Sequence, residues 1–214
     1  SAHRAADAPP GYAHAVVVTD GRIAYAGPRS AAPRDWLGVT KPARRRTGAR
    51  GRRARAVDSP LLRLRGVDLY RDYRPVLRDV NWDIERGVHW AVVGPNGSGK
   101  STLLRFVYGE FPAALGGLVE RHGHPPGTHL EEWRRRAAFV SPELQADYRD
   151  RVTVLELVVS GLRSSIGLDA PPTRAEVRCA RAALRRAGAL AWAGRAFHEL
   201  SYGQRRIALL ARAL

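Results

Sequence analysis

The chain has 214 residues, 44% of them hydrophobic, which is enough for one domain of about 150 residues with further segments. Its formal charge of +16 suggests nucleic acid or an acidic membrane surface as partners, and its single cysteine, Cys179, excludes an internal disulfide. No apolar run approaches the ~20 residues that a membrane-spanning helix needs, and no signal peptide is visible, so we expect a cytoplasmic protein.

Much of the positive charge lies in one stretch. Residues 41–56 hold eight basic side chains and no acidic one, among proline, glycine, threonine and alanine. This composition is typical of a solvated linker. Contact with RNA, DNA or a membrane surface through this stretch stays open as the alternative.

In chain order, the first expected element is a β-hairpin over residues 11–28. Residues 13–19 have a strand pattern, and Asp20-Gly21 is a strong tight-turn pair. Residues 22–26 are expected to form the returning strand of the hairpin. Residues 29–59 are rich in proline, arginine and alanine and predict a linker. A new domain is expected to start near Pro60.

The pattern after Pro60 mixes strands and helices. Strands are expected over residues 62–70, 76–84, 90–93, 118–121 and 136–140. Helices are expected to start at residue 103 and to cover 153–162, 173–187 and 204 onward. The last pattern runs to Leu214 without a stop signal, and the chain starts at Ser1 without a methionine, so we expect both ends to be cut.

A glycine-rich loop joins the apolar strand 90–93 to the helix that follows it. The loop fits G-x-x-x-x-G-K-[ST], the phosphate-binding P-loop. Its residues are Gly94, Pro95, Asn96, Gly97, Ser98, Gly99, Lys100, Ser101 and Thr102. The glycines let backbone N–H groups point at phosphate oxygens, and the helix start adds partial positive charge. We expect Lys100 to reach the β- and γ-phosphates of ATP and the Ser101 hydroxyl to bind Mg²⁺.

A second phosphate-binding pattern stands about 100 residues later. The sequence Leu200-Ser201-Tyr202-Gly203-Gln204 precedes a helical pattern. The Ser201 hydroxyl and the backbone of Gly203 can hydrogen-bond a γ-phosphate. The alternative is an ordinary serine cap at a helix start.

Together the two motifs resemble those of ATP-binding cassette (ABC) ATPases, whose signature is LSGGQ. The resemblance covers residues 60–214, about the first two-thirds of one ABC domain. It implies an α/β P-loop NTPase fold with an antiparallel β subdomain and an α-helical subdomain, incomplete at the C-terminus. It also implies ATP hydrolysis, with Ser201, Gly203 and Gln204 contacting nucleotide.

Shorter matches narrow the resemblance to ModF-type ABC ATPases, tandem proteins associated by name with molybdate transport or photorepair. The matching dipeptides include Asn81-Trp82 and His89-Trp90. The resemblance implies that residues 1–28 are the tail of a preceding ABC domain, with His3 as its switch histidine. Tyr70 stands where the family has an adenine-stacking aromatic, and Tyr73 is the competing candidate.

The chain departs from the family pattern at two places. Pro142 stands where the family has its Q-loop glutamine, and Glu143 and Gln145 are nearby. The Walker B aspartate and catalytic glutamate are expected after Leu214, so this chain alone is expected to be inactive in hydrolysis.

The resemblance implies a head-to-tail pair of domains that traps two ATP molecules. Lys100 and Ser101 would belong to one composite site, and Ser201 and His3 to the other. Membrane permease subunits would then be partners at the inner face of the plasma membrane. Three other functions stay open: an ABC protein acting on nucleic acid or ribosomes, a P-loop transferase, and a module that only binds nucleotide.

Overall fold

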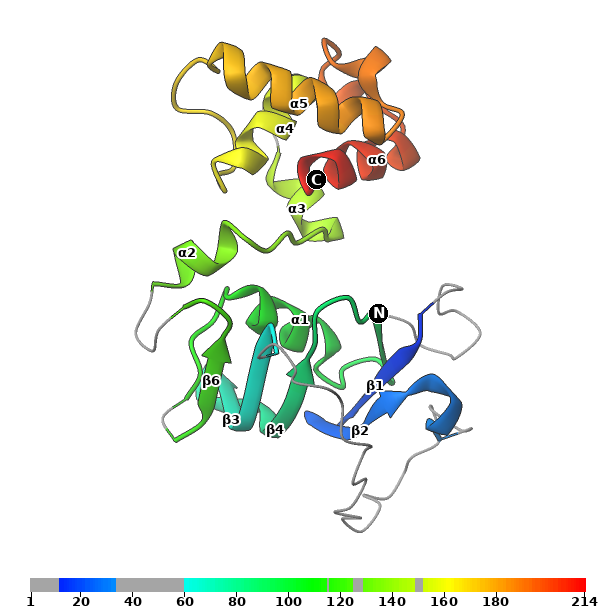
Figure 1. Cartoon of the computed structure of the whole chain (residues 1–214), viewed down its shortest axis with the longest axis vertical. Coiled ribbons are helices and arrows are strands. Elements are labelled where there is room, and N and C mark those ends of the chain that lie inside the picture. Colours follow the sequence, from blue (N-terminus) through cyan, green and yellow to red (C-terminus); the bar gives the residue numbers. More distant parts are fainter. Residues whose placement is uncertain (1–11, 34–59, 115, 125–128, 149–151) are drawn as a thin grey trace. The chain divides into compact units, whose positions relative to one another are not determined.

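The computed structural model describes residues 12–33, 60–114, 116–124, 129–148 and 152–214. The chain divides into two compact units, Ser1–His129 and Leu130–Leu214 (Figure 1). Among the described residues, the first unit holds six strands, one α-helix and one short 3₁₀ helix, and the second unit is helical. Each unit is described by itself.

The first unit begins with the predicted hairpin. Strand β1 (His14–Thr19) pairs antiparallel with β2 (Arg22–Pro28), and the short helix η2 (Arg29–Ala31) follows. The turn residues Asp20 and Gly21 have φ values of 50° and 73°, as a tight hairpin turn requires. The other edge of β1 pairs in parallel with β5 (Trp90–Val93), which gives the strand order β2-β1-β5.

A second sheet follows in the same unit. Strand β3 (Leu62–Arg71) lies between β4 (Arg74–Ile84) and β6 (Leu118–Arg121), antiparallel to both. Exposed ion pairs cross its ladders: Arg65 Nη2 lies 2.6 Å from Asp83, and Arg63 Nη1 lies 2.9 Å from Glu120. Their exposure limits each to about 0–1 kcal/mol, so the apolar core carries the stability of the sheet.

That core lies where helix α1 (Lys100–Tyr108) packs against residues of both sheets. Leu103 and Phe106 of α1 are fully buried, together with Val16 and Val18 of β1 and Trp82 of β4. A smaller cluster covers the other face of β1 and β5. Both faces of β1 are therefore buried, and α1 is fixed at the end of β5.

The second unit contains five α-helices and two short 3₁₀ turns among its described residues. They are α2 (Leu130–Arg134), α3 (Pro142–Asp147), α4 (Val154–Leu162), α5 (Arg174–Arg186), η3 (Leu190–Trp192), η4 (Phe197–Glu199) and α6 (Tyr202–Arg212). Helices α4, α5 and α6 start with capping boxes in which Thr153, Thr173 and Ser201 cap the first turn. Each box satisfies helix-end amides that would otherwise lack a partner.

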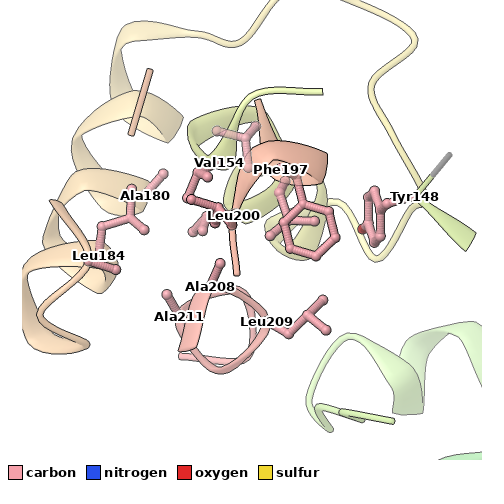
Figure 2. Packing of buried hydrophobic residues seen from close by; sticks show 13 residues of the cluster. Tyr148, Val154, Ala180, Leu184, Phe197, Leu200, Ala208, Leu209 and Ala211 are labelled. Carbon is pink, nitrogen blue, oxygen red and sulfur yellow. The ribbon is translucent and has the colours of Figure 1, made fainter. Parts of the chain in front are cut away.

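The helices of this unit share one core (Figure 2). Ala180 and Leu184 of α5 point towards Leu200 and towards Ala208 of α6 (Figure 2). The ring of Phe197 lies edge-on to that of Tyr148, with ring centroids 5.9 Å apart. This packing fixes the segment just before α6, and so the start of α6 itself.

A partly buried polar network joins three parts of the helical unit. Arg212 Nε at the end of α6 donates to Tyr148 Oη at 2.7 Å, and Arg212 Nη2 donates to the Ser165 carbonyl at 2.9 Å. The Tyr148 hydroxyl also lies 2.8 Å from Ser160 Oγ of α4. Since Tyr148 directly follows α3, the network links α3, α4 and α6.

The mixed α/β architecture is confirmed, with an antiparallel sheet and a separate helical unit. The strand expected over residues 136–140 is wrong. The turn that closes α2 includes a hydrogen bond from Ala137 N to Arg134 O, and Ser141 caps α3. Between them no described strand pairs with the segment, and Val140 is 37% exposed. Of the described helices, none combines the length and the apolar character that crossing a bilayer requires.

Candidate nucleotide site

The P-loop curls between the end of β5 and the start of α1. Its three glycines all have positive φ, 147° at Gly94, 77° at Gly97 and 99° at Gly99, where a side chain would be strained. Gly94 is also confined, because an added Cβ would lie 2.0 Å from the Val18 carbonyl oxygen of β1. The glycines thus give the loop a shape that other residues would not adopt.

The side chain of Lys100 is drawn back into this loop. Its Nζ donates to the carbonyl oxygens of Gly94 at 2.9 Å and Pro95 at 2.7 Å, and the residue is 6% exposed. Burial lowers the pKa of the ammonium. Both acceptors are neutral, so these contacts leave the positive charge uncompensated and available to a bound anion.

The start of α1 differs from the starts of α3, α4, α5 and α6. Its N-cap is Gly99, in the left-handed conformation, and within the described part of the chain no side chain caps it. The first turn of α1 also holds no acidic residue. Its first amides have no partner inside the helix, and the Ser98 hydroxyl is buried with no partner among the described residues. This donor set suits an anion such as a phosphate.

The remaining P-loop residues lie around this donor set. Asn96 and Gly97 are exposed at the loop tip, and Ser101 is exposed in the first turn of α1 beside the half-buried Thr102. Magnesium keeps several waters and substrate phosphate oxygens as ligands, so one hydroxyl oxygen from the protein fits it. The assignment of Ser101 to Mg²⁺ therefore agrees with the chemistry of the residues present.

Two tyrosines were candidates for stacking on adenine. Tyr70 lies near the end of β3 and is 53% exposed, and Tyr73 lies in the β3–β4 turn with its side chain fully exposed. Both belong to the unit that holds the P-loop. Each ring has free surface for stacking, and the choice of Tyr70 stays a prediction.

The signature residues lie in the helical unit, at the start of α6. Ser201 Oγ accepts from Gln204 N at 3.3 Å, and Gln204 Oε1 accepts from Ser201 N at 3.0 Å. Gly203 has open space around it within 4 Å, and Tyr202 is 59% exposed. Ser201 keeps its hydroxyl hydrogen while accepting the Gln204 amide, so it can still donate to an anion.

Other predicted positions can be located only in part. His3 and residues 41–56 lie outside the described residues. Pro142, at the family's glutamine position, is the first residue of α3, and Ser141 Oγ accepts from Leu144 N at 3.1 Å. Gln145 is half-buried within the same helix.

The sequence interpretation missed the contact between the hairpin turn and the P-loop. Gly21 N donates to the Ser98 carbonyl at 3.1 Å, and Arg78 N donates to the Gly21 carbonyl at 2.8 Å. The Asp20-Gly21 pair predicted the turn, but a local turn motif does not indicate which segment the turn contacts. The loop is thus bonded to a segment more than 70 residues earlier in the chain.

Comparison with known proteins bears on this site. Residues 77–214 match the ABC transporter family. The chain is 37% identical over 152 residues to the ABC transporter ATP-binding protein ModF of Escherichia coli. It is 40% identical over 149 residues to the zinc transport system ATP-binding protein TroB of Treponema pallidum. These alignments cover 70% and 69% of this chain, but only 31% and 54% of the two relatives.

Solved structures give the same result. A nucleotide-free ATP-binding cassette from an ABC transporter matches with a TM-score of 0.60 at 25% identity, over 72% of this chain and 64% of that one. The expected resemblance to ABC ATPases is confirmed. Because the family match begins within β4 and continues through the P-loop and the helical unit to Leu214, the chain belongs to the ABC transporter family.

Proposed function

We propose that the chain binds ATP with Mg²⁺ at its P-loop and acts in ATP hydrolysis as part of a transport-associated ABC protein. The observation that carries the proposal is the start of α1, where Lys100 brings an uncompensated charge to a helix end that no described side chain caps. In the family as a whole this element binds ATP. The chain's relatives are named as ATP-binding proteins of zinc and manganese transport systems.

Each P-loop residue has a distinct part in this proposal. The backbone amides of the loop and of the first turn of α1 hold the β- and γ-phosphates. The Lys100 ammonium turns from the carbonyls of Gly94 and Pro95 to the phosphate oxygens, and Ser101 holds Mg²⁺, which neutralises charge on the phosphates. Tyr70 supports the adenine ring.

We further propose that hydrolysis takes place in a head-to-tail pair of ABC domains. Residues 60–214 belong to one domain, residues 29–59 form a linker, and residues 1–28 come from a preceding domain that contributes His3. One composite site then contains Lys100 and the other contains Ser201 with Gly203 and Gln204. Residues 1–214 alone bind ATP without rapid turnover, because they lack an assigned general base.

Transport is favoured over action on nucleic acid. The relatives with printed functions are named for transport, including the manganese transport protein MntB of Bacillus subtilis, 34% identical over 141 residues. The nucleic-acid alternative rests on the basic residues 41–56, which lie outside the described residues. We therefore infer membrane permease subunits as partners, in a cytoplasmic protein held at the inner face of the membrane.

The proposal is tested by Lys100→Ala, with Lys41→Ala as its control, since these are the two lysines of the chain. Losing one charge-assisted contact of about 1.5–3 kcal/mol should weaken ATP binding about ten- to a hundredfold. Titration calorimetry with Mg·ATP measures the affinity. Unchanged affinity in Lys100→Ala, or no binding by the unaltered protein, would contradict the proposal.

A further inference from the structure

One exposed face of α5 carries a straight row of arginines. The helix contains five arginines and one acidic residue, Glu176. At about 100° of rotation per residue, four of the arginines lie within an arc of about 60° around the helix axis. We call these four the arginine stripe, and all are exposed: Arg174, Arg178, Arg181 and Arg185.

The stripe is separate from the side of α5 that packs into the core. Ala180 and Leu184 are fully buried in the core shared with α4 and α6 (Figure 2). Glu176 lies on the far side of the helix from the stripe, and its carboxylate pairs with Arg163 Nε at 2.8 Å. Within the described part of the chain, no ion pair involves a side chain of the stripe.

The stripe does little to stabilise the helix that carries it. Arg174 and Arg178 are like charges four residues apart, and so are Arg181 and Arg185, a spacing at which like charges repel. Arg174 also stands at the first position of α5, where the helix dipole disfavours a cation, and only Arg185 lies in the last turn, where the dipole favours one. An anionic partner outside the helix would relieve this repulsion.

The face fits a flat anionic surface. At 1.5 Å per residue the stripe extends for about 17 Å, and the exposed residues beside it, Ala175, Cys179 and Ala182, are small. The four guanidinium groups can therefore reach one plane. Proteins that bind single-stranded nucleic acid stack bases on aromatic rings, and α5 contains no aromatic residue. The headgroups of an anionic lipid leaflet attract basic side chains without needing such rings.

We propose that the arginine stripe of α5 binds the anionic headgroups of a membrane surface. The choice of a membrane rests on the proposed transport role, whereas the charge and the shape of the face are independent of it. The guanidinium groups donate to lipid phosphate oxygens. The exposed residues of α5 include no large apolar side chain, so the contact stays at the headgroups and needs no nucleotide.

The test is sedimentation of the full chain with vesicles of phosphatidylcholine and phosphatidylglycerol in a ratio of about three to one. The double variant Arg178→Gln/Arg181→Gln removes the centre of the stripe, and glutamine has nearly the helix propensity of arginine. The matched control, Arg74→Gln/Arg86→Gln, removes the same charge from exposed positions of the first unit. Each arginine at an anionic surface contributes about fivefold in affinity. We therefore expect the α5 variant to bind about twenty- to thirtyfold more weakly, and the control to change less than about twofold.

Three further measurements show that the contact is electrostatic. Arg178→Lys/Arg181→Lys keeps the charge and should keep most of the binding. Vesicles of phosphatidylcholine alone should not bind, and binding should be lost as salt shortens the Debye length from about 10 Å at 0.1 M to about 3 Å at 1 M. Circular dichroism checks that each variant is folded; if the double glutamine variant is not, its two single replacements, each expected to weaken binding about fivefold, take its place.

Several results would overturn the proposal. They are an absence of vesicle binding by the unaltered protein, equal losses in the α5 variant and its control, and binding that persists in 1 M salt. Vesicle binding through residues 41–56 would leave the α5 variant unchanged and would overturn it too. A larger effect of the α5 variant on binding to a DNA duplex than to vesicles would make nucleic acid the partner instead.

A titration with Mg·ATP separates this proposal from the proposed function. The α5 variant should bind Mg·ATP as the unaltered protein does, because the P-loop is unchanged. If the unaltered protein binds Mg·ATP but no vesicles, the membrane surface is overturned and ATP binding stands. If it binds vesicles through the stripe but no Mg·ATP, the proposed function is overturned and the membrane surface stands.

Discussion

Replacing Gly161 by alanine separates helix propensity from packing, because the two effects have opposite signs at this position. Gly161 lies in the last turn of α4, against the end of α6. An added Cβ would lie 2.4 Å from the Arg212 carbonyl oxygen and 2.7 Å from Arg212 Cγ. Propensity alone favours alanine in a helix by up to about 1 kcal/mol.

In the structure, the unfavourable packing effect of the added methyl group outweighs the gain in helix propensity. The Arg212 side chain is held by Tyr148 Oη and by the Ser165 carbonyl, so it cannot move aside without breaking those hydrogen bonds. Overpacking of this kind costs about 1–3 kcal/mol, and each broken hydrogen bond costs about 1 kcal/mol. With one hydrogen bond lost and about 1 kcal/mol of helix propensity gained, Gly161→Ala should destabilise the protein by about 1–3 kcal/mol.

The assay is urea unfolding followed by circular dichroism at the helix band, and the control is Gly203→Ala. Gly203 also lies in a helix, but nothing stands within 4 Å of its added Cβ. The control should therefore be neutral or gain up to about 1 kcal/mol. A Gly161→Ala protein as stable as the unaltered one, or more stable, would refute the close approach of α4 and α6.

Two further predictions concern the same helical unit. Tyr148→Phe removes the hydroxyl between Arg212 and Ser160, and we expect a loss of about 1–2 kcal/mol in the same unfolding assay; no loss would show that the network does not stabilise the fold. Glu176 has a pKa lowered to about 2, first by hydrogen bonds from the Arg163 guanidinium and then by the capping threonine. Because this folded-state pKa lies below the ordinary value of 4.5, the stabilisation is complete above about pH 4.5 and is lost as the pH falls towards 2. Thermal melts of Glu176→Gln should therefore lie below those of the unaltered protein at pH 6 and approach them near pH 2; parallel curves at all pH values would contradict the assignment.

The helix starts were predictable from sequence because their signals are local. Thr153 and Thr173 each stand three residues before a glutamate, and each proved to be the N-cap of a helix that begins at the next residue. Ser201 and Gln204 form the same box at the start of α6. A capping box involves only neighbouring residues, so it can be recognised in the sequence without knowledge of the fold.

Strands were predicted less securely, because a strand is defined by its partner. Residues 90–93 and 118–121 were expected as strands and have the predicted bounds in β5 and β6. Residues 136–140 have a similar apolar pattern, but no described strand pairs with them. Pattern alone cannot separate these cases, since the hydrogen bonds of a strand come from residues far away in sequence.

The position of β1 in the sheet is indicated by a sequence pattern that a search for local motifs does not use. Residues 15–18 are four consecutive apolar residues without exposed surface, whereas β2 alternates between exposed and half-buried residues. A run that is apolar on both faces is typical of a strand with covered faces in a parallel arrangement. A hairpin with such a first strand needs a neighbour for its free edge, and β5, apolar throughout, provides one. The pairing places the hairpin turn at the far side of the P-loop, so the loop is held by α1 at its end and by Gly21 behind Ser98.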